Sequence, residues 1–451
     1  MTVLETFADF SAHVRYPDLS DPERETLSLH LLDTMGAAIA GCRTPNGRAL
    51  RELQTPAGGD TAVWNRGTID DVAVRTGTVR HTEIDDIHTS SNVTPSSIIV
   101  PSTLTMCARL GVSDPALIGS ALISGYEAIL RLGMAIDGPI VMYEGIWPTF
   151  FCAPFGTAAA TARLMNLPAD ATAQALANAL TLCTGGAGAP GRNRPGRWFV
   201  IGEAARAGVA AALAAAHGFT ADLGLLDGEW LSQSHGLRGK PDALTEKLGR
   251  KCIVTDISMK PCCTGKQVAA ALAAFQKLLS EGLDPEAATK IEVHVPKRYA
   301  AMVDRRLMPG TNRSTTGNLR YQFALAAFHP DGLFDAARSE RIYDARLDAL
   351  MDKVAIKVDD SHEQYMPTYW PARVEVATPK AKFVETVVAA PGDPDRRFSA
   401  SEVREKFHTL TDRLIGEDNA EDWIEACDGA LSSPEGSERL ISKLEKLFEE
   451  G

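Results

Sequence analysis

Long runs of small apolar residues constrain this chain more than any other feature of its sequence. Residues 156–167 (GTAAATARLMNL), 171–182 (ATAQALANALTL) and 202–219 (GEAARAGVAAALAAAHGF) are rich in alanine, with leucine or valine recurring every few positions. This spacing is typical of helices, and the small side chains allow neighbouring helices to approach closely. The first half of the chain therefore predicts a compact helical bundle whose inner helices are nearly all apolar.

The hydrophobic period changes after about residue 258. A helix is predicted over 265–280, with a further apolar segment at Tyr321–Phe328, and four segments then alternate apolar and polar residues as strands do. These segments are 290–296, 353–359, 372–378 and 383–390. Helical patterns return in 399–416 and 437–450, just as Asp21 with Pro22 opens a capped helix near the start of the chain.

These patterns predict a mainly α fold with two domains. Residues 1–258 and 396–451 are expected to form a large all-helical domain from both ends of the chain. Residues 259–395 are expected to form a smaller inserted α+β domain, with PGDPD (391–395) as the linker that returns to the bundle. The length of 451 residues agrees with more than one hydrophobic core.

Charge and cysteine content exclude several classes of protein. The chain has 58 acidic and 46 basic residues, and a net charge of −12 argues against nucleic acid and membrane surfaces as partners. Its eight cysteines are too few for a disulfide scaffold, and none forms a zinc-like CxxC pair. No signal peptide and no uninterrupted apolar run long enough for a membrane helix is expected, since Arg206 breaks the run 204–216. We expect a soluble cytoplasmic protein.

The first candidate site is an acidic segment, HTEIDDIHTSSNVTPSS (81–97). His81, Glu83, Asp85, Asp86 and His88 fall within eight residues. Carboxylates and imidazoles of this kind can bind a divalent metal, and a carboxylate that orients an imidazole can also serve acid/base chemistry. Helix capping and surface solvation are the simpler alternative.

Two cationic segments are further candidates. Arg192, Arg194 and Arg197 precede a predicted helix, whose N-terminus favours anions, and arginine binds carboxylates through two hydrogen bonds. Lys260 and Lys266 flank a tight turn before the helix at 265–280, and a desolvated lysine can act as a base. The alternatives are an exposed basic loop and two surface lysines. The glycines of 185–208 do not form a GxGxxG dinucleotide motif.

Taken in order, five segments resemble the MmgE/PrpD family, which includes 2-methylcitrate dehydratase, cis-aconitate decarboxylase and iminodisuccinate epimerase. They are LLDTMGAAIAG (31–41), EIDDIHTSSNVTPSS (83–97), GIWPTFFCAPFGTAAATARLMNL (145–167), RWFVIGEAARAGVAAALAAAHGF (197–219) and SMKPCCTGK (258–266). The resemblance implies a helical domain from both ends of the chain, a smaller lid domain, an active site in the cleft and usually a homodimer.

The chain also departs from the family at several positions. The family's histidine before Pro-Ser corresponds to Thr94, and a second histidine corresponds to Trp147. The lysine before the alanine-rich helix becomes Arg197, no histidine follows Lys260 in its turn, and the family's tyrosine after Asn318 falls on Phe323, with Tyr321 two residues away. Asp85, Asp86 and Lys260 are kept, while the loss of two histidines removes groups that titrate near neutral pH.

The leading hypothesis is a cofactor-independent lyase or isomerase that moves a proton α to a carboxylate. Lys260 is the predicted acid/base, and His88, oriented by Asp85 or Asp86, is the second proton carrier. Arg197 and Lys266 would bind the substrate carboxylate, together with Thr94, Trp147 and Tyr321. The indole of Trp147 suggests a substrate less densely charged than a tricarboxylate. The alternatives are a non-catalytic binding protein and a metal-dependent hydratase that uses Glu83 with Asp85, Asp86 and His88.

Overall fold

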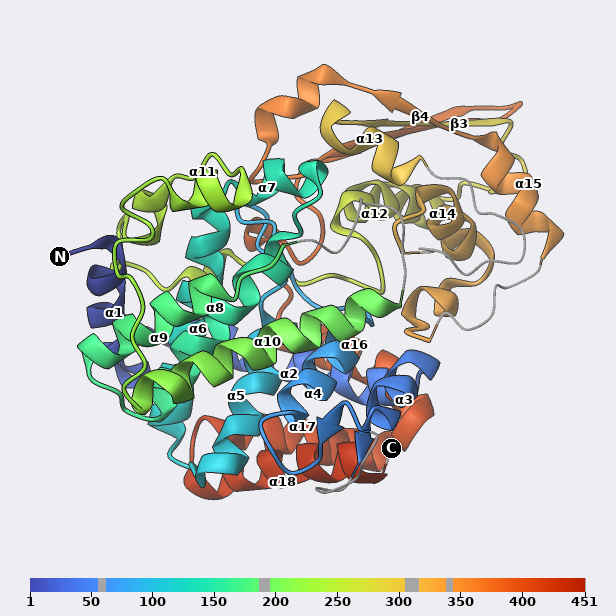
Figure 1. Ribbon diagram of the computed structural model, residues 1–451. Coiled ribbons are helices and arrows are strands. Elements are labelled where there is room, and N and C mark those ends of the chain that lie inside the picture. The colour runs from blue at the N-terminus through green and yellow to red at the C-terminus, as the bar shows by residue number, and fades with distance from the viewer. Residues whose placement is uncertain (56–61, 186–194, 305–315, 338–343, 451) are drawn as a thin grey trace. The chain divides into compact units, whose positions relative to one another are not determined.

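The computed structural model describes residues 1–55, 62–185, 195–304, 316–337 and 344–450 (Figure 1). Contacts between Cα atoms divide the chain into two compact units. The larger unit contains Met1–His81, Asp85–Ile257 and Val403–Gly451, and the smaller unit contains Thr82–Ile84 and Ser258–Glu402. The fold is mainly α, as predicted. The grouping of Thr82–Ile84 with the smaller unit has no counterpart in the sequence pattern.

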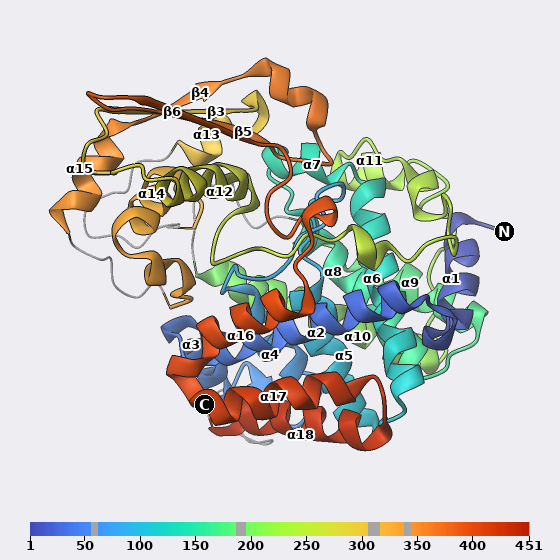
Figure 2. The same ribbon diagram turned by 180° about the vertical axis from the view of Figure 1, so that it is seen from behind.

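Helices form nearly all of the larger unit (Figures 1 and 2). From the first part of the chain they are α1 (Val3–His13), α2 (Asp21–Cys42), α3 (Pro45–Glu52), α4 (Asp71–Arg80), α5 (Ser96–Leu110), α6 (Pro115–Ala135), α7 (Gly138–Val141), α8 (Pro148–Leu164), α9 (Ala169–Thr181), α10 (Gly196–Ala216) and α11 (Trp230–His235). The C-terminal part adds α16 (Ala400–Ile415), which enters this unit at Val403, then α17 (Glu417–Ala430) and α18 (Pro434–Glu450).

Helix α2 starts one residue earlier than its sequence indicates. Ser20, not Asp21, is the N-cap residue, and its backbone N–H and hydroxyl donate to the Glu23 carboxylate at 2.9 and 2.7 Å. Further along α2, the buried carboxylate of Asp33 pairs with Lys406 of α16 at 2.6 Å. This ion pair ties the returning C-terminal segment to the first part of the chain within the larger unit.

Small residues bring the helices of the larger unit into close contact. A Cβ atom at Gly202 of α10 would lie 2.4 Å from the Ala73 carbonyl of α4, and one at Gly208 would lie 2.0 Å from the Pro154 carbonyl of α8. Only glycine permits backbones to approach so closely. Alanines fill the space between α8, α9 and α10, in the buried clusters Ala162, Ala175, Ala212, Ala215 and Ala158, Ala179, Ala211. The predicted helical bundle is confirmed.

The larger unit is not entirely helical, which corrects the sequence expectation. The short strands β1 (Gln54–Thr55) and β2 (Trp64–Asn65) pair in parallel. The buried indole of Trp64 stacks on Phe199 of α10, with 5.2 Å between the ring centroids. Strands of two residues have too short a sequence signature to be recognised by alternation.

Two helices of the larger unit, α6 and α10, are long and apolar enough to cross a membrane by length and composition. The most apolar window is 89% buried within the protein for α6 and 50% buried for α10. The expectation that no such helix exists was wrong by this measure, because it required an uninterrupted apolar run, and Arg206 breaks the run 204–216. Core helices of soluble proteins pass the same test, so length and composition are weak support for a membrane segment.

The smaller unit contains a four-stranded sheet, in the order β4–β3–β5–β6. The strands are β3 (Lys290–Val295), β4 (Val354–Val358), β5 (Ala372–Ala377) and β6 (Lys382–Val387). Strand β3 runs parallel to β4 and antiparallel to β5, which runs antiparallel to β6. The four strands predicted from alternation are confirmed with small changes in their limits.

Helices of the smaller unit cover one face of this sheet and extend beside it (Figure 1). They are α12 (Lys266–Ser280), α13 (Lys297–Val303), α14 (Leu319–Phe328) and α15 (Ala345–Lys353). Helix α12 packs against β5 and β6, and apolar side chains of β3 and β5, such as Val293 and Val374, are buried. Alternate residues instead form ion pairs, for example Lys290 with Glu292 at 2.9 Å and Lys382 with Glu375 at 2.6 Å. This division explains the period of two.

Candidate functional site

Asp86 of the acidic segment is a fully buried anchor in the larger unit. One of its carboxylate oxygens accepts the backbone N–H of Ser96 at 3.1 Å, and the other accepts the Ser96 hydroxyl. His30 Nδ1 of α2 lies 2.9 Å from the same carboxylate, and Tyr126 of α6 contacts the Ser96 hydroxyl at 2.5 Å. A negative charge at the start of α5 is favourable for the helix dipole. Asp86 therefore links α2 to α5 directly, and Ser96 extends the link to α6.

Asp85 is also buried, and it contacts a cluster of cationic and aromatic side chains. The Ser97 hydroxyl donates to its carboxylate at 2.7 Å, and Arg80 Nη1 lies 3.4 Å away. The Arg80 guanidinium lies 5.8 Å from the ring centroid of Trp198, and Trp198 also contacts Arg197. Asp85 is thus the acidic member of a mixed charged and aromatic cluster.

His88 is oriented by a serine and not by Asp85 or Asp86, which corrects the sequence hypothesis. Its Nδ1 lies 2.9 Å from the Ser91 hydroxyl, and its backbone N–H donates to the Val93 carbonyl at 2.8 Å. Burial lowers the pKa of the imidazole to about 4, against the weaker opposing effect of Asp256 and Asp86. The ring is neutral at pH 7, which makes it a poor proton donor there.

This pKa predicts how stability depends on pH. In the folded protein His88 stays neutral down to pH about 4, whereas in the unfolded chain it takes up a proton below its ordinary value of 6.5. The unfolded state therefore binds more protons between these values, and the contribution of His88, roughly 3 kcal/mol, is lost as pH falls through this window. Urea unfolding at pH 7 and pH 4.5 measures it. A His88→Gln variant should lose less stability than the natural protein over this interval; an equal loss in both would contradict the burial of a neutral ring.

Thr94, which the resemblance places at a histidine of the family, contacts a neighbouring helix. Its backbone N–H donates to the Thr149 hydroxyl at 3.0 Å, and the two hydroxyls lie 3.2 Å apart. Thr149 belongs to the first turn of α8, and Trp147 is the residue that precedes this helix. The acidic segment is therefore tied to the start of α8, next to the second departure from the family.

Arg197 and Trp147, two of the predicted substrate-binding residues, are in contact within the larger unit. The Arg197 guanidinium carbon lies 5.2 Å from the ring centroid of Trp147 and 3.9 Å from that of Trp198. Arg197 is in the first turn of α10, where the helix dipole favours anions. Contact with the two indole rings holds the guanidinium in place. Arg192 and Arg194 lie outside the described residues.

Lys260 of the smaller unit lies in a turn fixed by its surroundings. Its ammonium donates to the Glu83 carbonyl at 3.2 Å, and its side chain is only 4% exposed. Glu83 has a left-handed backbone with φ 56°, and its carboxylate accepts the Thr316 hydroxyl at 2.7 Å. Left-handed backbone is uncommon for a residue of this type and is concentrated at functional sites.

Backbone hydrogen bonds hold the same turn, Ser258–Lys266, from three sides. They join Met259 N–H to the Gly392 carbonyl at 3.0 Å, Cys263 N–H to the Leu333 carbonyl at 2.9 Å, and Gly265 N–H to the Thr316 carbonyl at 2.9 Å. The predicted linker at 391–395 is thus part of the structure around Lys260 in the smaller unit. It is more than a connection between domains.

Lys266 has a different environment from the one its predicted role requires. Its ammonium pairs with the Asp393 carboxylate, and both side chains are almost fully buried. Burial lowers the pKa of Lys266 below its ordinary value, because its effect outweighs the opposing effect of the neighbouring Asp393 carboxylate. The expected carboxylate-binding cation is therefore already paired with a carboxylate of the same unit.

Phe323 and Tyr321 of α14 have different surroundings. Phe323 stacks on Phe275 of α12 with 4.4 Å between parallel rings, so the position matching the family's tyrosine is part of the apolar core. Tyr321 is buried, and its backbone N–H donates to the capping side chain of Asn318 at 3.0 Å. Neither position provides an exposed phenol.

Comparison with known proteins identifies the family of this chain. The sequence model of the MmgE/PrpD N-terminal domain matches residues 5–243, and that of the C-terminal domain matches residues 261–432. The chain belongs to the MmgE/PrpD family. It is 24% identical over 328 residues to cis-aconitate decarboxylase of Aspergillus terreus. The alignment covers 70% of this chain and 62% of that enzyme, so the chain spans less than two thirds of its relative.

Several contacts in this MmgE/PrpD protein join residues that the sequence does not associate. His30 lies beside Asp86, Glu83 contacts both Lys260 and Thr316, and Asp393 pairs with Lys266. All four pairs are distant in the sequence. The separation is 56 positions for His30–Asp86, 177 for Glu83–Lys260, 233 for Glu83–Thr316 and 127 for Lys266–Asp393. Among these residues, only Asp393 lies in a segment with a local sequence signal. The proline and glycine of PGDPD indicate a turn, but they do not indicate that Lys266 pairs with it.

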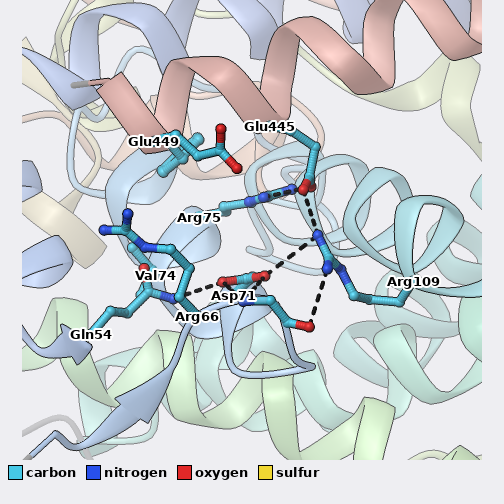
Figure 3. Close-up of a pocket in the computed structure, with 10 residues that line it drawn as sticks. Gln54, Arg66, Asp71, Val74, Arg75, Arg109, Glu445 and Glu449 are labelled. Carbon is cyan, nitrogen blue, oxygen red and sulfur yellow. Dashed lines mark hydrogen bonds and ion pairs between the residues drawn. The ribbon is translucent and has the colours of Figure 1, made fainter. Parts of the chain in front are cut away.

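Two hollows in the larger unit involve none of the predicted site residues. The smaller, of about 70 Å³, is lined by three arginines and three acids, namely Arg66, Arg75, Arg109, Asp71, Glu445 and Glu449 (Figure 3). Arg75 pairs with Glu445 at 2.6 Å, and Arg109 contacts both Glu445 and Asp71. These contacts tie α18 to α4 and α5. The larger hollow, of about 390 Å³, lies around Phe10, Glu127 and Lys251.

The metal-site hypothesis finds no support in the geometry. Within residues 1–55, 62–185, 195–304, 316–337 and 344–450, no group of three or more His, Cys, Asp or Glu side chains is arranged to hold a metal ion. Asp85, Asp86 and His88 are instead engaged by Ser97, Ser96 and Ser91.

Proposed function

We propose that this MmgE/PrpD protein is a lyase-like enzyme that moves a proton at the carbon α to a carboxylate, with Lys260 as the proton carrier. The observation that carries the proposal is the buried ammonium of Lys260 in a turn fixed by hydrogen bonds on several sides. Family membership and the similarity to a decarboxylase support a lyase-like role. A small carboxylic or hydroxy acid is the proposed substrate.

The chemistry explains why a positioned lysine is suitable. A carbon acid next to a carboxylate is weak, so its anion must be stabilised as it forms. A neutral lysine amine accepts the α-proton, and the resulting ammonium lies beside the enolate and stabilises its charge. In the opposite direction the ammonium returns the proton to carbon. Dehydration, decarboxylation and epimerisation share such a proton transfer and differ in the leaving group.

Arg197 is the proposed carboxylate-binding residue, and its contact with Trp147 indicates the kind of acid bound. An indole in place of histidine adds apolar surface beside the guanidinium. This pairing favours an acid with one carboxylate near Arg197 and an apolar group near Trp147. Lys266, already paired with Asp393, is not included in this role.

Replacing Arg197 with methionine tests this assignment. The variant removes the charge and keeps the length of the stem, so the KM of the substrate should rise roughly 10- to 100-fold, as expected for loss of a charged hydrogen bond. Arg197→Lys, which keeps the charge but loses the planar group, should show a smaller increase. Initial-rate kinetics provide the measurement, and an unchanged KM in Arg197→Met would remove Arg197 from the site.

The experiment for the function itself is proton exchange followed by NMR in deuterated buffer. The panel contains citrate, methylcitrate, aconitate, iminodisuccinate and hydroxy acids with one carboxylate and an apolar group. Deuterium uptake at an α-carbon, or conversion to a new product, supports the proposal and identifies the substrate. Absence of both for every acid that binds in a thermal-shift assay would contradict it.

A ligand-binding protein without turnover is the second candidate. The replacement of two family histidines by Thr94 and Trp147, together with a neutral His88, favours this alternative. It predicts tight binding of a carboxylate, seen as a thermal shift, with no exchange and no product. Turnover of any acid that binds would exclude it.

A further inference from the structure

The ion pair between Lys266 and Asp393 is unusual because both charges are almost completely removed from water. The side chains are 4% and 1% exposed. Asp393 uses its second carboxylate oxygen to accept the backbone N–H of Ala390 at 2.8 Å. Removing two charges from water costs free energy that their attraction often only offsets, and apolar side chains of similar size are frequently as stable. Stability alone therefore gives little reason for this pair.

The location of the pair suggests another reason. Lys266 is the first residue of α12 and ends the turn that carries Lys260, while Asp393 belongs to the return segment 390–396. The return segment folds on itself through bonds from Gly392 N–H to the Arg396 carbonyl at 2.8 Å and from Arg396 N–H to the Asp393 carbonyl at 2.7 Å. The ion pair thus joins a closed turn to the start of the helix that follows Lys260.

A second contact between these segments lies directly beside Lys260. Met259 N–H donates to the Gly392 carbonyl at 3.0 Å. Gly392 has φ 86°, and a Cβ atom there would lie 2.1 Å from the Met259 carbonyl and 2.7 Å from the Phe398 ring. Only glycine fits both the left-handed backbone and this close approach. The return segment therefore contacts the lysine turn at residue 259 and at residue 266, on either side of Lys260.

We propose that Lys266 and Asp393 are a positioning pair that fixes the turn bearing Lys260. The inference rests on the proposed function, because it assigns the pair to the placement of the proton carrier. Neither residue needs to touch the substrate. Asp393 holds both the Lys266 ammonium and the Ala390 N–H, so loss of its charge releases one end of the turn, while the Met259–Gly392 contact retains the other.

The test measures the placement of Lys260 without relying on turnover. Each variant is treated with an amine-acylating reagent, and the modified fraction of Lys260 is compared with that of exposed Lys290 by peptide mass spectrometry. In Asp393→Asn, Lys260 should be modified about tenfold faster, because the turn opens more often. The kcat for the identified substrate should fall by a similar factor with KM nearly unchanged.

A double variant and a matched control separate positioning from general stability. Lys266→Met combined with Asp393→Leu replaces the ion pair with apolar contacts, so the thermal midpoint should fall only by what the lost Ala390 N–H bond costs. It still lacks the acceptor for Ala390 N–H, so Lys260 should remain more reactive than in the natural protein. Lys277→Met removes another lysine of α12, whose partner Glu385 lies 2.7 Å away at the surface. This control should leave the modification of Lys260 unchanged.

The outcomes are distinct. Unchanged modification of Lys260 in both Asp393→Asn and the double variant would overturn the proposal. A raised KM in Lys266→Met with unchanged modification would make Lys266 a substrate-binding residue and would also overturn it. If the natural protein turns over no acid, the proposed function fails, and the modification rates alone still decide whether this pair positions Lys260.

Discussion

Replacing Lys260 with alanine is expected to reduce turnover by 10²- to 10⁴-fold, the range typical of a lost general acid or base. The expectation follows from its position in the smaller unit, where the buried ammonium is held by the Glu83 carbonyl and the turn is fixed at Met259, Cys263 and Gly265. A group so placed loses little freedom when the reaction begins. Single-turnover kinetics on the identified acid measure the chemical step directly.

Two control variants test whether the loss of turnover comes from the chemical step. Lys260→Arg keeps a positive charge but holds its proton at all accessible pH values, so it should bind the substrate without restoring turnover. Lys277→Ala removes a lysine from the exposed face of α12 and should leave kcat unchanged. Full turnover in Lys260→Ala would show that another group transfers the proton.

Replacing Asp86 with alanine is expected to lower the free energy of unfolding by about 3–5 kcal/mol, as observed when one partner of a buried charged network is removed. The Ser96 hydroxyl and the Ser96 N–H lose their acceptor, His30 loses the carboxylate beside it, and these groups are buried. Urea unfolding followed by circular dichroism at pH 7 provides the measurement.

The matched variant is Asp86→Asn, which keeps one oxygen for the Ser96 N–H. It should cost less than alanine, because only the charge and one acceptor are lost. If Asp86→Ala kept its urea midpoint and lost only turnover, Asp86 would be a catalytic residue, as its place in the acidic segment first indicated. A large loss of stability in alanine and a smaller one in asparagine would establish the anchoring role.

The features predicted correctly from the sequence are those set by local patterns. Alternation over 290–296 and 372–378 identified β3 and β5 because one face of the sheet is buried and the other carries ion pairs. Alanine-rich runs identified α8 to α10 because close packing needs small side chains. The N-cap of α2 was misplaced by one residue, since Ser20 and Asp21 are both good capping residues.

The site was predicted less well because its contacts depend on tertiary packing. Lys260 was identified, but its partner, the Glu83 carbonyl, depends on a left-handed backbone 177 positions earlier. Lys266 was interpreted as an available cation because no sequence pattern reveals Asp393 beside it. His88 was expected near a carboxylate, and burial with Ser91 instead keeps it neutral.

The contact between Arg197 and Trp147 could not be predicted from residue type alone. The resemblance marks each as a departure from the family, and they are 50 positions apart in the sequence, yet their side chains are in contact. The two residues are physically related, because a guanidinium stacks on an indole better than an ammonium does. Paired changes of this kind are recognisable only once the fold is known.

The most direct test of the central claim is deuterium uptake at the α-carbon of the bound acid, followed by proton NMR in deuterated buffer. The natural protein and Lys260→Ala are compared at equal concentration, with thermal shift used to show that both bind the acid. Uptake by the natural protein and its loss in the variant is the predicted result. Equal uptake by both proteins would contradict the assignment of proton transfer to Lys260.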